Sequence, residues 1–235
     1  MASEYVLSRR GLFRLGGTAA AGLALARWAP ILAQEMHGPV SPDEALLQLI
    51  AGNHRWATGQ ATRPHQDNSR RLEATQGQHP IAVVFSCVDS RVPPEIVFDQ
   101  GLGDLLVIRT AGHVIDNAAL GSIEFGVEEL HIPLVVVLGH ERCGAVNATI
   151  EAIEANATAH GQIGTLIEGI RPAVEQTHGH SGDALDNAVR ANTVLTVDAL
   201  RTRSSLLREA LSHGEVKIVG GRYDLQSGLV EITVP

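Results

Sequence analysis

The chain has 235 residues, of which 44% are hydrophobic and 19% charged, and this composition fits one globular domain with a sizeable core. Its formal net charge is −8 and it has no basic block, which argues against nucleic acid as a partner. Aromatic residues make up only 3%, so the core is expected to consist mainly of Val, Leu, Ile and Ala.

Residues 1–33 are expected to be an export signal rather than part of the fold. Arg9 and Arg10 form a twin arginine, and a weakly apolar stretch of Gly, Ala and Leu follows at 15–25. This pattern predicts a twin-arginine signal, a periplasmic location and no stable membrane insertion after the signal is removed. An amphipathic helix that stays attached is the alternative.

The domain is expected to span residues 34–235 and to begin with a helical arm at 34–78. Ser41, then Pro42 and two acids, form a typical helix start, and leucines continue the pattern to near Gly59. The polar remainder of the arm predicts one short helix.

Residues 79–235 are expected to form an α/β core. Short apolar runs rich in β-branched residues and bounded by Gly or Pro predict buried parallel strands at 81–86, 105–109, 134–138 and 216–219. Between and after them, helices are expected at 117–130, at 145–155 and at 183–211, the last as one helix or two joined ones. A final run at 230–234 predicts a closing hairpin. The alternation indicates a central, mainly parallel β-sheet flanked by helices.

The two cysteines follow two of these strands. Cys87 ends the first apolar run, and His140 and Cys143 follow the third. Ligands gather at the carboxyl ends of parallel strands, so the three residues are expected on one rim if those strands are neighbours. Two thiolates and one imidazole suit zinc and leave one position of a tetrahedral ion free. A disulfide between the cysteines, which an oxidising compartment would favour, is the alternative.

The motif Cys87-x-Asp89-Ser90-Arg91, followed by His140-x-x-Cys143-Gly144, resembles the signature of the β-class carbonic anhydrases. The similarity covers nearly all of the mature chain. It implies an enzyme that binds Zn2+ through Cys87, His140 and Cys143. The reaction it implies is the reversible hydration of carbon dioxide to bicarbonate and a proton by zinc-bound hydroxide.

The resemblance also implies roles for the two charged residues beside Cys87. Asp89 would accept the hydrogen of the hydroxide, and Arg91 would keep Asp89 ionised and oriented. In some members of the family this Asp binds zinc as a fourth ligand, and the sequence leaves both states open. A local surface ion pair is the non-functional interpretation.

Four residues are expected to line the substrate pocket by the same resemblance. Gln78 matches a glutamine of the family's pocket, and Gly144 adjoins Cys143. Leu106 and Phe125 stand where plant-type enzymes have phenylalanine and tyrosine, although Phe125 fits a helix core equally well. His113, where the family often has asparagine, is either a proton carrier or a structural histidine.

Two other functions remain open at this point. The same fold can hydrolyse carbon disulfide or carbonyl sulfide, and a zinc- or bicarbonate-binding protein without turnover would keep the metal ligands. The presence of both Asp89 and Arg91 argues against the second, because a structural zinc site favours four protein ligands. The resemblance further implies a homodimer or a dimer of dimers, with the N-terminal arm lying across the partner.

Overall fold

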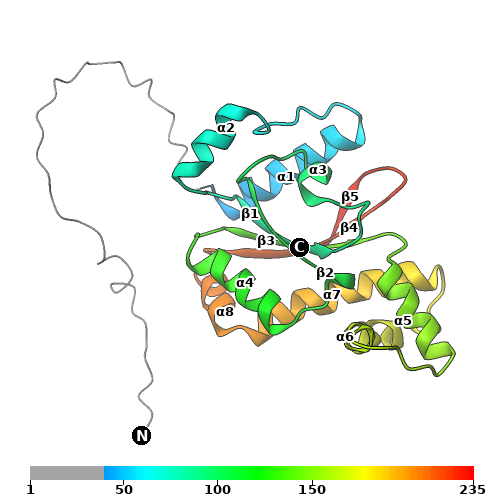
Figure 1. The fold of residues 1–235 in the computed structure, drawn as a ribbon. Helices are drawn as coiled ribbons and strands as arrows, with labels where there is room; N and C mark the ends of the chain where they lie inside the picture. The colour runs from blue at the N-terminus through cyan, green and yellow to red at the C-terminus, as the bar shows by residue number, and fades with distance from the viewer. Residues whose placement is uncertain (1–39) are drawn as a thin grey trace, which may run out of the picture. The chain divides into compact units, whose positions relative to one another are not determined.

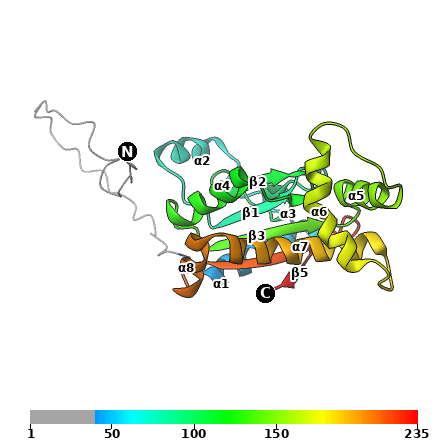
Figure 2. The same cartoon turned by 90° about the horizontal axis from the view of Figure 1, so that it is seen from below.

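The computed structural model describes residues 40–235, which form a five-stranded sheet between two layers of helices (Figures 1 and 2). The strand order is β2-β1-β3-β4-β5. The first four strands are parallel, and β5 runs antiparallel to β4 as the second strand of a hairpin. The strands are β1 (Ala82–Cys87), β2 (Leu105–Thr110), β3 (Leu134–His140), β4 (Lys217–Tyr223) and β5 (Val230–Val234). The predicted fold class is therefore confirmed.

One face of the sheet is covered by α4 (Asn117–Glu128), α7 (Ala184–Arg203) and α8 (Ser205–Ser212). Alternate residues of β1 face this layer, where Val83 and Phe85 are fully buried. The predicted helical region at 183–211 is two helices. They separate at Ser204, whose hydroxyl accepts a hydrogen bond from the backbone N–H of Leu207 at 3.1 Å and so caps α8.

The other face is covered by α1 (Pro42–Ala57) and the short α3 (Pro94–Val97). Helix α1 begins with the predicted cap, because the Ser41 side chain and the Glu44 carboxylate bond each other's backbone N–H. Its residues Ala45 and Leu49 are fully buried against this chain's own sheet. Part of the apolar face of α1 is thus covered within one chain, whereas Leu47 is 67% exposed, and the arm across a partner stays a prediction.

The remaining helices lie at the two ends of the sheet. Helix α2 (Asn68–Glu73), followed by a 3-10 turn at Ala74–Gln76, is the short helix expected in the polar part of the arm. Helices α5 (Gly144–Glu154) and α6 (Ile163–Thr177) pack on each other beside α7, beyond the carboxyl ends of the strands. The sequence did not predict α3 or α6. Through Val146 and Ile170 these outer helices bury the two cysteines.

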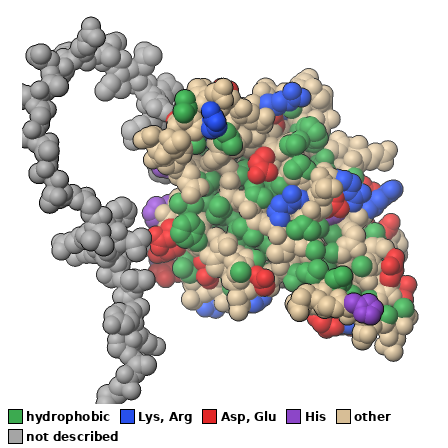
Figure 3. Space-filling model, viewed as in Figure 1, with side chains coloured by type: hydrophobic (Ala, Val, Ile, Leu, Met, Phe, Trp, Pro, Cys, Tyr) green, Lys and Arg blue, Asp and Glu red, His purple; other side chains and the backbone are tan. Residues whose placement is uncertain are grey.

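Strand β2 forms an open edge of the sheet, because among residues 40–235 it pairs with β1 alone. All six of its residues are half-buried, unlike the fully buried β1 and β3. In Figure 3, hydrophobic side chains gather over the middle of the face that carries β2 and α4. Phe125 of α4 contributes to the exposed apolar surface, with 52% of its area accessible.

No helix within residues 40–235 has both the length and the apolar character needed to cross a membrane. The predicted signal at 1–33 lies outside the described residues.

Candidate metal centre and active site

The strands β1 and β3 are neighbours in the sheet, with Val84 paired to Val136 and Ser86 to Leu138. Cys87 is the last residue of β1, and His140 is the last residue of β3. Since the strands are parallel, both side chains lie at the end of the sheet where the strands have their carboxyl ends. The condition that the sequence left open, adjacency of these two strands, is met.

Cys143 reaches the same place from the start of a helix. The chain turns sharply after His140 through Arg142, which has a left-handed backbone with φ 52°, and Cys143 then caps α5. The first N–H groups of a helix carry partial positive charge and favour an anion beside them. The N–H groups of Ala145 and Val146 therefore act to lower the pKa of Cys143, although the effect of the neighbouring Cys87 is larger and raises it. The thiolate is the form that binds a metal.

The three side chains enclose a space of the right size for a tetrahedral ion. One ligand atom from each of Cys87, His140 and Cys143 lies within 4.8 Å of the other two, and all three residues are buried. The two sulfurs are 3.9 Å apart. Two thiolates bound at ~2.3 Å to one tetrahedral zinc would be separated by about 3.8 Å. A disulfide needs ~2.05 Å, and both cysteines are free, so the disulfide alternative is not what the fold adopts.

His140 presents one particular nitrogen to this space. Its Nδ1 lies 2.9 Å from the carbonyl oxygen of Glu141, which can only accept, so Nδ1 carries the proton. Nε2 therefore has a free lone pair, and it is buried without a hydrogen-bond partner in the described part of the chain. An orphaned ring nitrogen facing two thiols fits a metal ligand, and the backbone carbonyl orients the ring.

Without a metal, the pKa values of the two thiols are shifted in opposite directions. The pKa of Cys87 is lowered, chiefly because its sulfur accepts a hydrogen bond from the thiol of Cys143, and the N–H of Gly112 lowers it further. The pKa of Cys143 is raised because its proton is held by the Cys87 sulfur and its own thiolate would be buried beside a like charge. A divalent cation would favour the ionised form of both.

Asp89 and Arg91 form a fork-like ion pair beside the metal ligands. Arg91 donates from Nε to Oδ1 at 2.9 Å and from Nη2 to Oδ2 at 2.8 Å, and its backbone N–H also reaches Oδ1 at 3.0 Å. These hydrogen bonds lower the pKa of Asp89 to about 2, so the carboxylate is ionised under all ordinary conditions. Oδ2 is 3.8 Å from Nε2 of His140. The pair is therefore oriented toward the metal position.

The sequence resemblances agree with this geometry. The family described as "Carbonic anhydrase" matches residues 82–230. A carbonic anhydrase of Mycolicibacterium smegmatis is 44% identical over 192 residues, covering 82% of this chain and 93% of the relative. Carbonic anhydrase 2 of Mycobacterium tuberculosis is 43% identical over 188 residues, covering 80% and 91%.

Among solved structures, a Coccomyxa β-carbonic anhydrase in complex with acetazolamide has a TM-score of 0.62 at 26% identity, covering 80% of this chain and 85% of that one. The chain belongs to the β-class carbonic anhydrase family. In a carbonic anhydrase of this class the metal is zinc, and the donor set of Cys87, His140 and Cys143 fits it.

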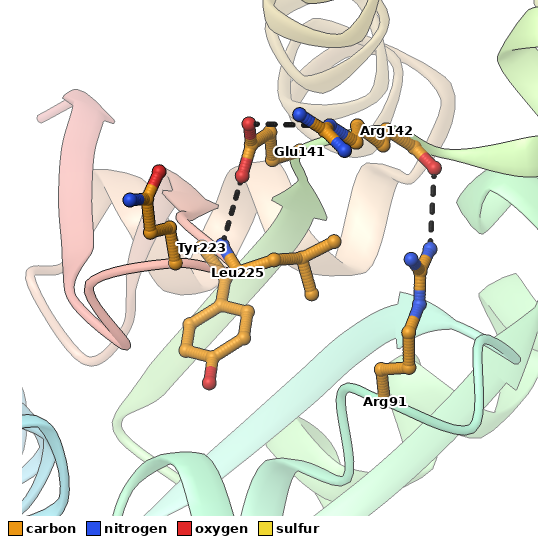
Figure 4. Close-up of a pocket in the computed structure, with 6 residues that line it drawn as sticks. Arg91, Glu141, Arg142, Tyr223 and Leu225 are labelled. Atoms are coloured by element: carbon orange, nitrogen blue, oxygen red, sulfur yellow. Dashed lines mark hydrogen bonds and ion pairs between the residues drawn. The ribbon is translucent and has the colours of Figure 1, made fainter.

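An open cavity of about 530 Å³ adjoins the outer side of this carbonic anhydrase site (Figure 4). Arg91 reaches across it and donates from Nη2 to the carbonyl oxygen of Arg142 at 3.2 Å. On the opposite wall, the carboxylate of Glu141 accepts a hydrogen bond from the backbone N–H of Leu225. The turn between His140 and Cys143 is thus hydrogen-bonded to Arg91 of the Asp89–Arg91 pair (the dyad) on one side and to the β4–β5 connection on the other.

The four predicted pocket residues do not gather around the metal ligands of the same chain. Gly144 does adjoin Cys143, and a side chain there would meet open space. Leu106 pairs with Val83, four residues before Cys87, which corresponds to about 13 Å along the strand. Gln78 is exposed in a shallow depression at the end of the arm, and Phe125 is exposed on α4 rather than in the core. Lining of the pocket by Gln78, Leu106 and Phe125 stays a prediction.

Three residues that support the site were not identified from the sequence. Arg109 donates hydrogen bonds to backbone carbonyls of the loop that follows β1. Gly112 donates its N–H to the sulfur of Cys87, and Asn192 contacts the turn that contains Gly112. Only Arg109 left a signal in the sequence, as a charged residue at the end of an apolar strand.

Proposed function

We propose that this chain catalyses the reversible hydration of carbon dioxide to bicarbonate with zinc held by Cys87, His140 and Cys143, and that Asp89 and Arg91 are its catalytic pair. The observation that carries this proposal is the placement of the dyad. An ionised carboxylate lies 3.8 Å from the metal-facing nitrogen of His140 and is held there by a guanidinium fork. A purely structural zinc site would have no use for such a group.

Zinc, when bound, supplies a Lewis acid that makes a water molecule nucleophilic near neutral pH. Asp89 accepts a hydrogen bond from the attacking oxygen and so directs a lone pair toward carbon dioxide. Arg91 keeps Asp89 ionised and holds both of its oxygens in one plane. Because Asp89 makes three hydrogen bonds to Arg91, this conformation supports the state in which Asp89 is an orienting base and not a fourth zinc ligand.

The test is the turnover of carbon dioxide, carbonyl sulfide and carbon disulfide by the same purified, zinc-loaded protein. Carbon dioxide is expected to be converted fastest, as measured by stopped-flow detection of released protons. Faster conversion of either sulfur compound would favour the hydrolase, and no conversion of any of the three would favour a binding protein.

We also propose that the chain acts as a homodimer formed over the β2 edge and α4. Three features of that face support this: an unpaired strand edge, the exposed Phe125, and an exposed Leu102 in the loop just before β2. The predicted pocket residues Leu106 and Phe125 belong to this side of the chain and not to the surroundings of their own metal ligands. In a dimer they would be available to the partner's site.

The dimer is tested by Phe125→Glu, which places a charge in the proposed interface. We expect this variant to sediment as a monomer and to lose carbon dioxide hydration. Ile163→Glu is the matched control, because Ile163 is similarly exposed but lies on α6. A dimeric Phe125→Glu protein, or a monomeric wild type, would contradict the proposal.

We propose, finally, that the protein is exported to the periplasm by the twin-arginine route. The support is the Arg9-Arg10 pair and the apolar stretch that follows it in the sequence. Replacing both arginines by lysine keeps the charge, and it should leave the protein in the cytoplasmic fraction with an uncleaved N-terminus. Periplasmic recovery of that variant would count against this route.

A further inference from the structure

The turn that follows β2 has an unusual backbone next to the metal site. In the 3-10 turn Ala111–His113, both Gly112 (φ 62°) and His113 (φ 43°) are left-handed. This conformation is unfavourable for a residue with a side chain, so His113 needs support from its surroundings. A Cβ at Gly112 would lie 2.6 Å from Cδ1 of the buried Ile170 and would sit on a left-handed backbone, so both packing and backbone conformation favour glycine there.

The conformation of this turn aims a backbone donor at a metal ligand. The N–H of Gly112 points to the sulfur of Cys87, with the nitrogen 3.3 Å from the sulfur, and both residues are buried. A hydrogen bond from an amide withdraws electron density from a thiolate. It therefore limits how much charge Cys87 donates to a bound metal, and it fixes the direction in which the sulfur presents its remaining lone pairs.

Asn192 of α7 holds both left-handed residues of the turn. Its side chain is buried, and its Nδ2 donates to the carbonyl oxygen of Gly112 at 2.8 Å. That oxygen can only accept, so the amide nitrogen and not the oxygen of Asn192 must face it. The second hydrogen of the same nitrogen reaches Nε2 of His113, 2.9 Å away. In this arrangement His113 carries its own proton on Nδ1, which is buried without a hydrogen-bond partner in the described part of the chain.

His113 is a structural partner in this arrangement. It is fully buried, and burial lowers its pKa to about 4, so the ring stays neutral and its Nε2 remains able to accept. Asn192, which lies 80 residues further along the chain than Gly112, thus connects α7 to the turn that supports Cys87.

We propose that Asn192 is a positioning residue for the zinc-binding thiolate of Cys87, acting through the Gly112–His113 turn. The inference rests on the assignment of Cys87 as a zinc ligand. Loss of the Asn192 amide would free the turn from its left-handed conformation and break the N–H to sulfur bond. The thiolate would then be less well placed for the metal and, once bound, more electron-rich.

The experiment compares Asn192→Leu, which keeps the side-chain size and removes both hydrogen bonds, with Asn53→Leu. Asn53 is an equally buried asparagine that joins α1 to the backbone at Val97 and Gly228, with no contact to the metal ligands. Two quantities are measured on the full chain: zinc affinity by competition with a chromophoric chelator, and the sulfur-to-cobalt charge-transfer band after replacement of zinc by Co2+.

For Asn192→Leu we expect roughly a 10- to 100-fold loss of zinc affinity. We also expect the charge-transfer band to move to longer wavelength, because a thiolate without its hydrogen bond is easier to oxidise. Asn53→Leu should lose stability and change neither quantity. If the leucine variant does not fold, Asn192→Ser replaces it, because the serine hydroxyl is too short to reach the turn. The same loss of zinc affinity and the same band shift are expected for it.

An unshifted band together with a zinc affinity within twofold of wild type would overturn the role of Asn192. Failure of the ligand assignment would look different. In that case the wild-type protein itself would show no thiolate charge-transfer band with cobalt.

Discussion

The guanidinium of Arg109 donates from Nε to the carbonyl oxygen of Cys87 at 2.8 Å, from the neighbouring strand. Its Nη2 reaches the carbonyl oxygen of Asp89 at 2.6 Å and that of Val92 at 3.4 Å. One side chain thus holds the backbone of Cys87 and of Asp89, the proposed catalytic carboxylate, in a single curved loop. No other side chain in the described part of the chain hydrogen-bonds to the carbonyl oxygens of both Cys87 and Asp89.

We expect Arg109→Lys to lower kcat/KM for carbon dioxide at least tenfold while most of the zinc is retained. Lysine keeps the charge but cannot reproduce a rigid fork over several carbonyls, so Asp89 would lose its orientation before Cys87 loses the metal. Stopped-flow rates and elemental analysis measure both effects. Arg190→Lys is the control, because Arg190 pairs with Asp186 and Glu231. A wild-type rate for Arg109→Lys would refute this role.

Replacing Asp89 by asparagine should lower carbon dioxide hydration roughly 10²- to 10⁴-fold with unchanged zinc content. Asparagine has the same shape, but it is neutral and turns an NH2 group toward either Arg91 or the metal position. The control is Asp43→Asn, which removes an exposed carboxylate paired with Lys217. Hydration within twofold of wild type would show that the dyad does not take part in the reaction.

Removal of zinc should expose the two cysteines to oxidation. Their sulfurs are 3.9 Å apart, so closing by about 2 Å would form a disulfide. We expect a mild thiol oxidant to produce this bond in the metal-free protein and not in the zinc-loaded protein, as counted by mass spectrometry of alkylated thiols. Zinc alone should not restore activity to the oxidised form, whereas a reductant followed by zinc should. Two persistent free thiols in the oxidant-treated, metal-free protein would contradict this.

Asp99 makes folding stability depend on acid pH. Burial alone would raise its pKa, but hydrogen bonds from Thr62, Arg55 and Arg63 outweigh burial and lower the pKa to about 2, from 3.8 in an unfolded chain. Because the pKa of Asp99 is lower in the folded chain, its ionised carboxylate contributes its full stabilisation above pH 4. This stabilisation is lost as the pH falls from 4 to 2. The difference corresponds to roughly 2 kcal/mol.

Asp99→Asn should therefore lower the free energy of unfolding by about 2 kcal/mol at pH 7. The difference in free energy of unfolding between this variant and the wild type should become smaller at pH 3, because wild-type Asp99 also begins to lose its ionic contribution there. Urea unfolding at the two pH values measures this. An identical difference in free energy of unfolding at pH 7 and pH 3 would mean that the hydrogen bonds do not depend on the charge of Asp99.

The strands and the metal ligands were readable from the sequence for simple reasons. A parallel strand that is covered on both faces is apolar at every position, so β1 and β3 stand out as continuous runs. Helix α1 carries a capping box at Ser41, which is a local signal. Cys87, His140 and Cys143 were predicted as metal ligands because they stand at or just after the ends of two apolar runs and include the only two cysteines of the chain.

Helix α6 was missed because its sequence contradicts local preferences. Gly164, Gly169 and Pro172 all lower helix propensity, yet Ile167 and Ile170 are buried and compensate through packing. Burial against other parts of the chain cannot be seen in a window of local sequence.

The order of residues alone was enough to determine the layered α/β fold and the Cys2His donor set, since both depend on apolar periodicity and on ligand chemistry near strand ends. Three relationships are seen only in the folded chain. Strands β1 and β3 are neighbours, Arg109 hydrogen-bonds to the backbone of the loop that carries Asp89, and Asn192 hydrogen-bonds to the turn beside Cys87. These contacts join residues up to 80 positions apart. Which residues meet in these contacts depends on how the strands and helices pack, and that packing cannot be predicted from the neighbouring residues in the sequence.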